Sequence, residues 1–149
     1  MRVVIERVHK AKVDVDGSTV GEIAQGLLLL IGVGQNSSEA IIPKMAEKIV
    51  NLRIFEDAEG KMNLSLLEIK GEILAVSQFT LYASLKKGRR PDFFDAAPPI
   101  KGEEYYEKFV AELKKYQVKV ETGNFGAHME VDFVNDGPVT IILDEKDLT

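Results

Sequence analysis

The sequence predicts a single α/β domain in which layered, mixed β-sheets are flanked by two main helices. Three observations support this fold class. The chain has 149 residues, which is enough for one domain with a sizeable core. Segments near both ends alternate apolar and polar residues or are apolar throughout, which is typical of strands. Two internal segments instead repeat apolar residues every three or four positions, which is typical of amphipathic helices.

No internal repeat, low-complexity segment or linker divides the chain, so we expect residues 1–149 to form one domain. The N-terminal part predicts four strands. "RVVIERV" and "AKVDVDG" are alternating and β-branched, and the His9-Lys10 pair between them is interpreted as a tight connection. "TVGEIAQ" follows the turn signal "DGS", and "GLLLLIGVG" is apolar enough for a strand that is buried on both faces.

The first helix is predicted after these strands. Its apolar residues recur at helical spacing at Ile41, Met45, Ile49 and Leu52. Ser37 or Ser38 is the candidate N-cap, because a serine side chain accepts a hydrogen bond from the first free amides of a helix. Pro43 is compatible with this helix only in its first turn.

The second half of the chain continues the alternation of strands and helices. "EDAEGKMN" is expected to be a polar turn, and "GEILAVSQFTL" an apolar strand that leads into a basic loop. The second helix is predicted by apolar residues at Tyr105 or Tyr106, Phe109, Leu113 and Tyr116. "VKVETG", "MEVDFV" and "VTIILD" supply the closing strands. Read locally, the intervening "NDGPVT" is a turn, because its residues are those that turns prefer.

Composition excludes several classes of function. There are no cysteines, so disulfides, thiolate zinc sites and cysteine nucleophiles are excluded. The two histidines, His9 and His128, are too few for a three-histidine zinc site, and we expect no metal and no cofactor. The longest apolar run is too short for a membrane helix and no secretory signal is visible, so we expect a cytoplasmic protein with no membrane partner.

Net charge also limits the possible partners. A net charge of −5 argues against broad coating of nucleic acid, although it allows contact at one patch. The densest basic cluster, hereafter the basic loop, comprises Lys86, Lys87, Arg89 and Arg90. Phenylalanines are interleaved with it in "SQFTLYASLKKGRRPDFF". This composition suits a loop that binds phosphates while an aromatic ring stacks on a base, although a solvated surface loop is the alternative.

The start of the same stretch raises a geometric problem. In a regular strand, Ser77 and Thr80 would point to opposite faces and could not share a pocket through their side chains. Either the strand ends or bulges here, or the backbone amides matter as much as the hydroxyl groups.

Four motifs together identify a family. "SQFTL" at 77–81, "KKGRRPDF" at 86–93, "TGNFGAHM" at 122–129 and "NDGPVT" at 135–140 occur in the order and spacing of the D-aminoacyl-tRNA deacylases, which the chain resembles from "MRVVIERV" to "ILD". The resemblance implies a barrel-like layered sheet, a homodimer, and hydrolysis of the ester of D-aminoacyl-tRNA without a cofactor. It also implies cleavage of glycyl-tRNA, because glycine has no side chain to be rejected.

The resemblance also implies roles for individual residues. Ser77, Gln78, Phe79 and Thr80 would be the catalytic residues, with the amides near Phe79 and Thr80 polarising the ester carbonyl. Gly137-Pro138 would have a cis peptide bond, enter the active site of the partner subunit and bind the substrate's ammonium group through its carbonyl oxygens. An L-amino acid would clash with that backbone, so D-amino acids would be selected.

The remaining implied residues surround these two motifs. Phe125 and Met129 would line the pocket, and Arg7 would steady the Gly-Pro motif. Without the resemblance, the local sequence favours core positions for Phe125 and Met129 and a surface charge at a strand edge for Arg7. The basic loop would contact the acceptor end of the tRNA. Thr80 has no base nearby in sequence, so hydrolysis assisted by the RNA's own hydroxyl or by a positioned water is favoured over attack by Thr80.

Two other functions are compatible with the residues. The first is a non-enzymatic dimeric module that binds a free amino acid and regulates a partner. The second is a different esterase that uses Thr80 or Ser77 with His128.

Overall fold

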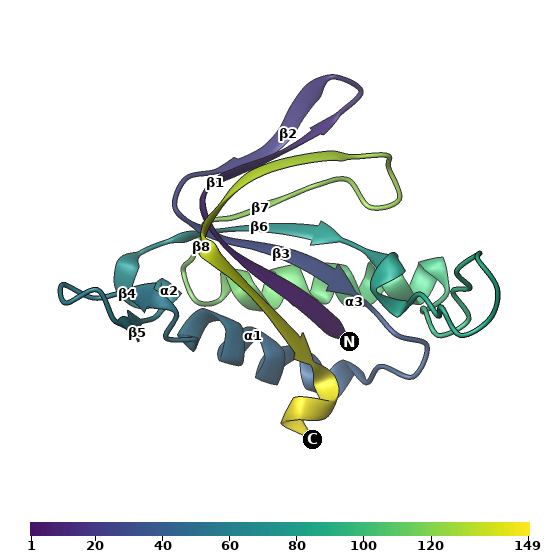
Figure 1. The fold of residues 1–149 in the computed structure, drawn as a ribbon. Helices are drawn as coiled ribbons and strands as arrows, with labels where there is room; N and C mark the ends of the chain where they lie inside the picture. Colours follow the sequence, from purple (N-terminus) through teal and green to yellow (C-terminus); the bar gives the residue numbers. More distant parts are fainter.

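The computed structural model describes residues 1–149 and confirms the mixed α/β fold class (Figure 1). One six-stranded sheet has the order β2-β1-β3-β6-β7, and β8 pairs with the other edge of β1. Its strands are β1 (Arg2–Val15), β2 (Ser18–Ile23), β3 (Gly26–Gly32), β6 (Glu72–Ser77), β7 (Val120–Thr122) and β8 (Glu130–Asp144). A small hairpin is formed by β4 (Phe55–Glu56) and β5 (Met62–Leu64). The helical segments are η1 (Glu39–Ile41), α1 (Ile42–Asn51), α2 (Leu66–Ile69), η2 (Phe79–Tyr82), α3 (Pro99–Lys114) and η3 (Glu145–Leu148).

Strand β1 corrects the predicted turn at His9-Lys10. It runs without reversal from Arg2 to Val15, so three strands form the N-terminal part rather than four. The reason is non-local: β8 pairs with β1 along both of its halves, and β3 and then β2 pair with its other edge. The ladders on both sides hold the His9 region extended, and only a register shift between Val8 and Lys10 marks it.

The sheet separates two apolar cores. Helices α1 and α3 lie side by side on one face of the sheet, and the larger core fills the space between helices and sheet (Figure 1). The sheet also curls so that β2 approaches β7, which gives it a nearly closed, barrel-like form. A smaller core fills the inside of this curl, with Val8, Ala11, Val13, Ile23, Leu28, Leu74 and Val76. Strand β3 is buried on both faces, as predicted, because its alternate side chains enter the two cores.

Both predicted helices are present. Helix α1 follows η1, whose N-cap is Ser38, and Pro43 lies in its first turn. Helix α3 begins earlier than predicted, at Pro99, and ends at Lys114, so Tyr116 lies beyond it. The short helix α2 was not predicted; a capping box of Ser65 and Glu68 starts it. No helix combines the length and the apolar character that crossing a membrane requires.

Tyr106 attaches helix α3 to the sheet close to the end of β6. Its hydroxyl donates to the Ala75 carbonyl oxygen at 2.8 Å. Burial raises the pKa of Tyr106 to about 12, so the hydroxyl keeps its proton near neutral pH and remains a donor. This hydrogen bond attaches the end of β6 to helix α3. The position at which the chain leaves the sheet after β6 is therefore fixed.

Candidate functional site

A cavity of about 730 Å³ opens where β6 ends. Its wall combines the end of β6, the segment between η2 and α3, the start of α3 and the loop before β8. Six of the residues singled out in the sequence line it, namely Ser77, Gln78, Phe79, Phe125, His128 and Met129. Because Phe93 of KKGRRPDF also lines it, three of the four sequence motifs meet in one cavity, and the first and the last of these three are about 45 residues apart along the chain.

The strand ends at Ser77, which resolves the geometric problem posed by the sequence. The amide of Gln78 makes the last bond to β3, to the Ile31 carbonyl at 2.8 Å, and the chain then turns into the 3₁₀ helix η2. The first amides of a helix have no acceptor within it, so the N–H groups of Phe79 and Thr80 are available as donors at the rim of the cavity.

Thr80 is placed differently from its neighbours. Its side chain is exposed and does not line the cavity, and its hydroxyl accepts a hydrogen bond from the Gln78 side-chain amide. His128 does line the cavity, but it forms no hydrogen bond with Ser77 or Thr80. The arrangement provides neither hydroxyl with a base.

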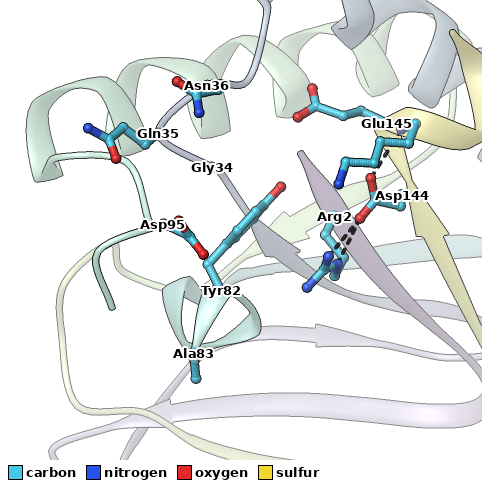
Figure 2. A pocket seen from close by; sticks show the side chains of 10 residues that line it. Arg2, Gly34, Gln35, Asn36, Tyr82, Ala83, Asp95, Asp144 and Glu145 are labelled. Carbon is cyan, nitrogen blue, oxygen red and sulfur yellow. Dashed lines mark hydrogen bonds and ion pairs between the residues drawn. The ribbon is translucent and has the colours of Figure 1, made fainter. Parts of the chain in front are cut away.

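Helix η2 is held from behind by Arg2. One guanidinium nitrogen donates to the Leu81 carbonyl oxygen at 2.8 Å, and the other two contact Asp144 at 2.8 and 2.9 Å. The guanidinium also lies over the Tyr82 ring, 5.0 Å from its centroid. These side chains line a separate, polar cavity of about 280 Å³ (Figure 2). Contacts from both ends of the chain therefore fix the short helix that carries the SQFTL motif.

The NDGPVT stretch does not reverse the chain. Strand β8 continues on both sides of it, with Asn135 opposite Val8 and Thr140 opposite Glu6. Four residues of β8, 136–139, therefore stand opposite the single residue Arg7, and the excess backbone bulges out of the ladder. Gly137 and Pro138 are exposed on this bulge, and the peptide bond between them is cis.

Arg7 holds the bulge from one side. It is 3% exposed and donates to the backbone carbonyls of Asp136, at 2.9 Å, and Ile54, at 2.7 Å. It also pairs with the Asp136 carboxylate at 3.4 Å. Gly137 has a φ of +140°, and a Cβ there would lie 2.7 Å from the Val139 side chain. The bulge therefore requires glycine at this position.

Glu6 holds the bulge from the other side, a role that sequence reasoning missed. Its Oε2 accepts hydrogen bonds from the Asn135 amide and the Thr140 hydroxyl, both at 2.5 Å, and the side chain is almost fully buried. Asn135 in turn accepts from the Val139 amide at 2.8 Å. The available signal was the charged Glu6-Arg7 pair between the apolar residues Val3 to Ile5 and Val8 of the strand.

The bulge and the cavity lie far apart in one chain. In the register of the sheet, the bulge lies opposite Arg7 of β1. Ser77 lies at the level of Val3 of the same strand, because Val3 pairs with Ile31 and Ile31 pairs with Ser77. This separation is about 13 Å along the strands, and β1 and β3 also lie between β8 and β6. The two motifs that the resemblance assigns to one composite site therefore do not meet within one chain.

The basic loop extends from the sheet beyond η2. Ser84 and Asp92 exchange backbone hydrogen bonds of 2.8 and 3.1 Å and close the loop at its base. Gly88 has a φ of +67° near the loop's tip. All four basic residues are exposed, and the ion pairs of the protein involve other cations. The loop presents unneutralised positive charge next to the cavity.

Comparisons with known proteins agree on one family. The family described as D-Tyr-tRNA(Tyr) deacylase matches residues 4–144. The D-aminoacyl-tRNA deacylase of Thermosipho africanus is 60% identical over 146 residues, covering 98% of both chains. That of Aquifex aeolicus is 55% identical over 148 residues, covering 99% of this chain and all of the relative.

Solved structures share the fold. A protein described as the c-Myc DNA unwinding element binding protein has a TM-score of 0.90 and 40% identity, covering 97% of this chain and 98% of its own. A probable eukaryotic D-amino acid tRNA deacylase has a TM-score of 0.80 over 95% of this chain and 97% of its own. At 18% identity, the second likeness concerns the fold alone.

The contacts of Glu6 lead to a prediction. Replacing Glu6 by leucine removes the acceptor of two donors that lie at the base of the bulge, so the free energy of unfolding should fall by about 1–3 kcal/mol. Glu6→Gln keeps an acceptor oxygen and should lose less than about 1 kcal/mol. Urea unfolding followed by circular dichroism measures both. Equal stability of the leucine variant and the unaltered protein would contradict the role of Glu6.

Proposed function

This chain belongs to the D-aminoacyl-tRNA deacylase family, and from that premise we propose which step of the reaction takes place at its cavity and which at its bulge. It is an ester hydrolase whose substrate is D-aminoacyl-tRNA. The proposal assigns hydrolysis to the cavity at the end of β6 and selection of the D-isomer to Gly137-Pro138. The observation that carries it is the convergence of the SQFTL motif, Phe125 and Met129 on one cavity beside the basic loop.

The ester end of the substrate lies in this cavity. The terminal adenosine is enclosed by Phe79, Phe125 and Met129, and the ester carbonyl faces the free amides of Phe79 and Thr80. Those amides stabilise the oxyanion that forms when water adds to the carbonyl carbon. The bond to the ribose oxygen then breaks, that oxygen takes a proton, and free D-amino acid and tRNA are released.

The activation of the water comes from the substrate. Thr80 has an exposed hydroxyl bonded to Gln78, with no histidine or lysine in contact, which leaves it without the base that a nucleophile needs. The neighbouring hydroxyl of the ribose is already placed beside the ester and can orient the water. Ser77 and Gln78 shape the site around this group.

The D-isomer is selected by exclusion of the L-isomer. The carbonyl oxygens of the Gly137-Pro138 bulge bind the α-ammonium group, because proline has no N–H and glycine no side chain to interfere. With the ammonium and ester both held, a D side chain points away, while an L side chain is driven into the backbone. Arg7 and Glu6 hold that backbone in place, so it does not move aside to admit an L side chain. Glycine presents no side chain to exclude, so glycyl-tRNA is also a substrate.

The bulge acts on the cavity of a second copy. Within one chain the two lie at different levels of the sheet, yet Gly137 and Pro138 are exposed and free to enter another molecule. Exposed apolar side chains of β8, Phe133, Val134 and Ile142, provide surface that a homodimer would cover. The functional unit is therefore a homodimer with two composite sites.

The tRNA is held by the basic loop, although the protein as a whole is acidic. Lys86, Lys87, Arg89 and Arg90 lie beside the cavity and contact the acceptor-end phosphates. Placing the densest cluster of unpaired positive charge beside the cavity favours RNA that also places its 3′ end in the cavity. Phosphate contacts of this kind weaken steeply as salt rises.

The deacylation assay tests the proposal. Purified protein should hydrolyse D-tyrosyl-tRNA about 100-fold or more faster than L-tyrosyl-tRNA, because a clash of about 3 kcal/mol corresponds to that ratio. Release of labelled tyrosine measures both rates. Similar rates for the two isomers would contradict the chiral selection by Gly137-Pro138. Binding of free amino acid without any deacylation would instead support a non-enzymatic module.

The role of Thr80 can be tested separately. Thr80→Ala should keep the rate on D-tyrosyl-tRNA within about threefold, whereas loss of a true nucleophile costs on the order of 10³-fold or more. Thr80→Ser serves as the matched control, and His128→Ala tests the alternative esterase. An acyl-Thr80 adduct detected by mass spectrometry in the unaltered protein would exclude substrate-assisted hydrolysis.

The composite site predicts contact between copies. Because the chain has no cysteine, Pro138→Cys and His128→Cys proteins can be mixed and joined by a short bis-maleimide. We expect a covalent product of twice the 16.5 kDa chain mass, and none when Lys61→Cys replaces His128→Cys. Sedimentation equilibrium should give a dimer. A monomer that still discriminates D- from L-tyrosyl-tRNA would overturn the proposal.

A further inference from the structure

Three phenylalanine rings stand at the rim of the cavity, and the apolar cores do not account for them. Phe94 is 82% exposed, Phe79 is 55% exposed and Phe93 is 37% exposed, and all three line the cavity. Phe79 and Phe93 contact one another edge to face, with centroids 5.0 Å apart and planes at 65°. Phe94 has no such aromatic partner. Its ring is the largest apolar surface that the rim leaves open.

The backbone beneath Phe94 is anchored on both sides. The Phe94 amide donates to the Asp92 carboxylate at 3.4 Å. The next residue's carbonyl accepts from the Gln35 amide at 2.7 Å, and the Ala97 amide donates to the Val33 carbonyl at 2.9 Å. The exposed ring therefore stands on a segment tied to the end of β3. An aromatic surface held in this way loses little freedom when a flat partner stacks on it.

The charge around Phe94 indicates what that partner is. The basic loop closes at the Ser84–Asp92 bridge, so Phe93 and Phe94 immediately follow its base. A flat aromatic surface beside four unpaired cations matches a single-stranded nucleic acid, in which phosphates and unstacked bases alternate. It suits a protein surface less well, because a partner covering the ring would also have to neutralise the loop.

We propose that Phe94 is the stacking platform for the unpaired nucleobase that precedes the terminal adenosine of the tRNA. The inference rests on the proposed function, in which the cavity takes the terminal adenosine and its ester. The strand that leaves the cavity passes over the rim, where its next base meets Phe94. The phosphates of the same strand then lie along the basic loop. Stacking does not depend on base identity, so the platform serves any tRNA.

The test compares two substrates of the unaltered protein and of Phe94→Ala. D-Tyrosyl-tRNA carries the preceding nucleotide, and 2′(3′)-O-D-tyrosyl-adenosine lacks it. Phe94→Ala should lower kcat/KM for the tRNA by about tenfold, mainly through KM, and leave kcat/KM for the adenosine ester within about twofold. Phe94→Trp should retain the activity on tRNA. Ile100→Ala, which removes an 85% exposed side chain outside the cavity, is the matched control.

Salt dependence separates stacking from phosphate contact. The slope of log kcat/KM against log salt concentration should be unchanged in Phe94→Ala and shallower in the Lys86→Ala, Arg90→Ala double variant.

Three outcomes would overturn the assignment. One is an unchanged kcat/KM on tRNA, and another is an equal loss on both substrates, which would place Phe94 in the wall of the adenosine site. The third is a fall of the sedimentation mass in Phe94→Ala, which would make it a contact between copies. Failure of the proposed function would be distinguishable, because the unaltered protein would then cleave neither substrate.

Discussion

The pairing of β1 with β8 is the constraint on which the site depends. These strands bring together residues 116 to 142 positions apart, from Asp14 with Glu130 to Arg2 with Asp144, and run side by side through nearly their whole lengths. At one point the ladder must absorb four residues of β8 opposite Arg7 alone. The surplus backbone has to leave the sheet, and what leaves is Gly137-Pro138. The main-chain element that we propose as the selector of the D-isomer thus arises as an irregularity in an otherwise continuous ladder, with regular pairing on either side to hold its base.

Two consecutive residues of β1 secure that irregularity in different ways. Arg7 supplies charged donors to backbone carbonyls, and Glu6 supplies a buried acceptor to the side chains that flank the bulge. Successive side chains of a strand point to opposite faces, so the two reach the bulge from opposite sides. The proposed selection by steric exclusion requires a surface that does not move, and this double attachment holds the bulge in place.

The cavity to which we assign hydrolysis likewise offers mainly backbone groups. Its free donors are amides at the start of a 3₁₀ helix, and the phenylalanine and methionine side chains in its wall contribute no acid or base. Arg2, Tyr82 and Asp144 fix that helix from behind, outside the cavity. An aminoacyl ester is already reactive, so an enzyme for it has more need of placement and discrimination than of strong chemical activation.

The sequence by itself determined the fold class, the buried strand β3, the two long helices and the family, because each depends on local periodicity or on short motifs. It also showed that Ser77 and Thr80 could not share a site from a regular strand, but it left open whether the strand ends, whether it bulges or whether backbone amides act beside the hydroxyl groups. Tertiary structure decided the rest. His9-Lys10 and NDGPVT both have turn-like local signals, yet both lie within continuous strands, because ladder hydrogen bonds to distant segments outweigh local preference. The contacts of Glu6 and the proposed role of Phe94 were hidden for the same reason, because the function of a buried acceptor or an exposed ring depends on neighbours that the fold brings close in space.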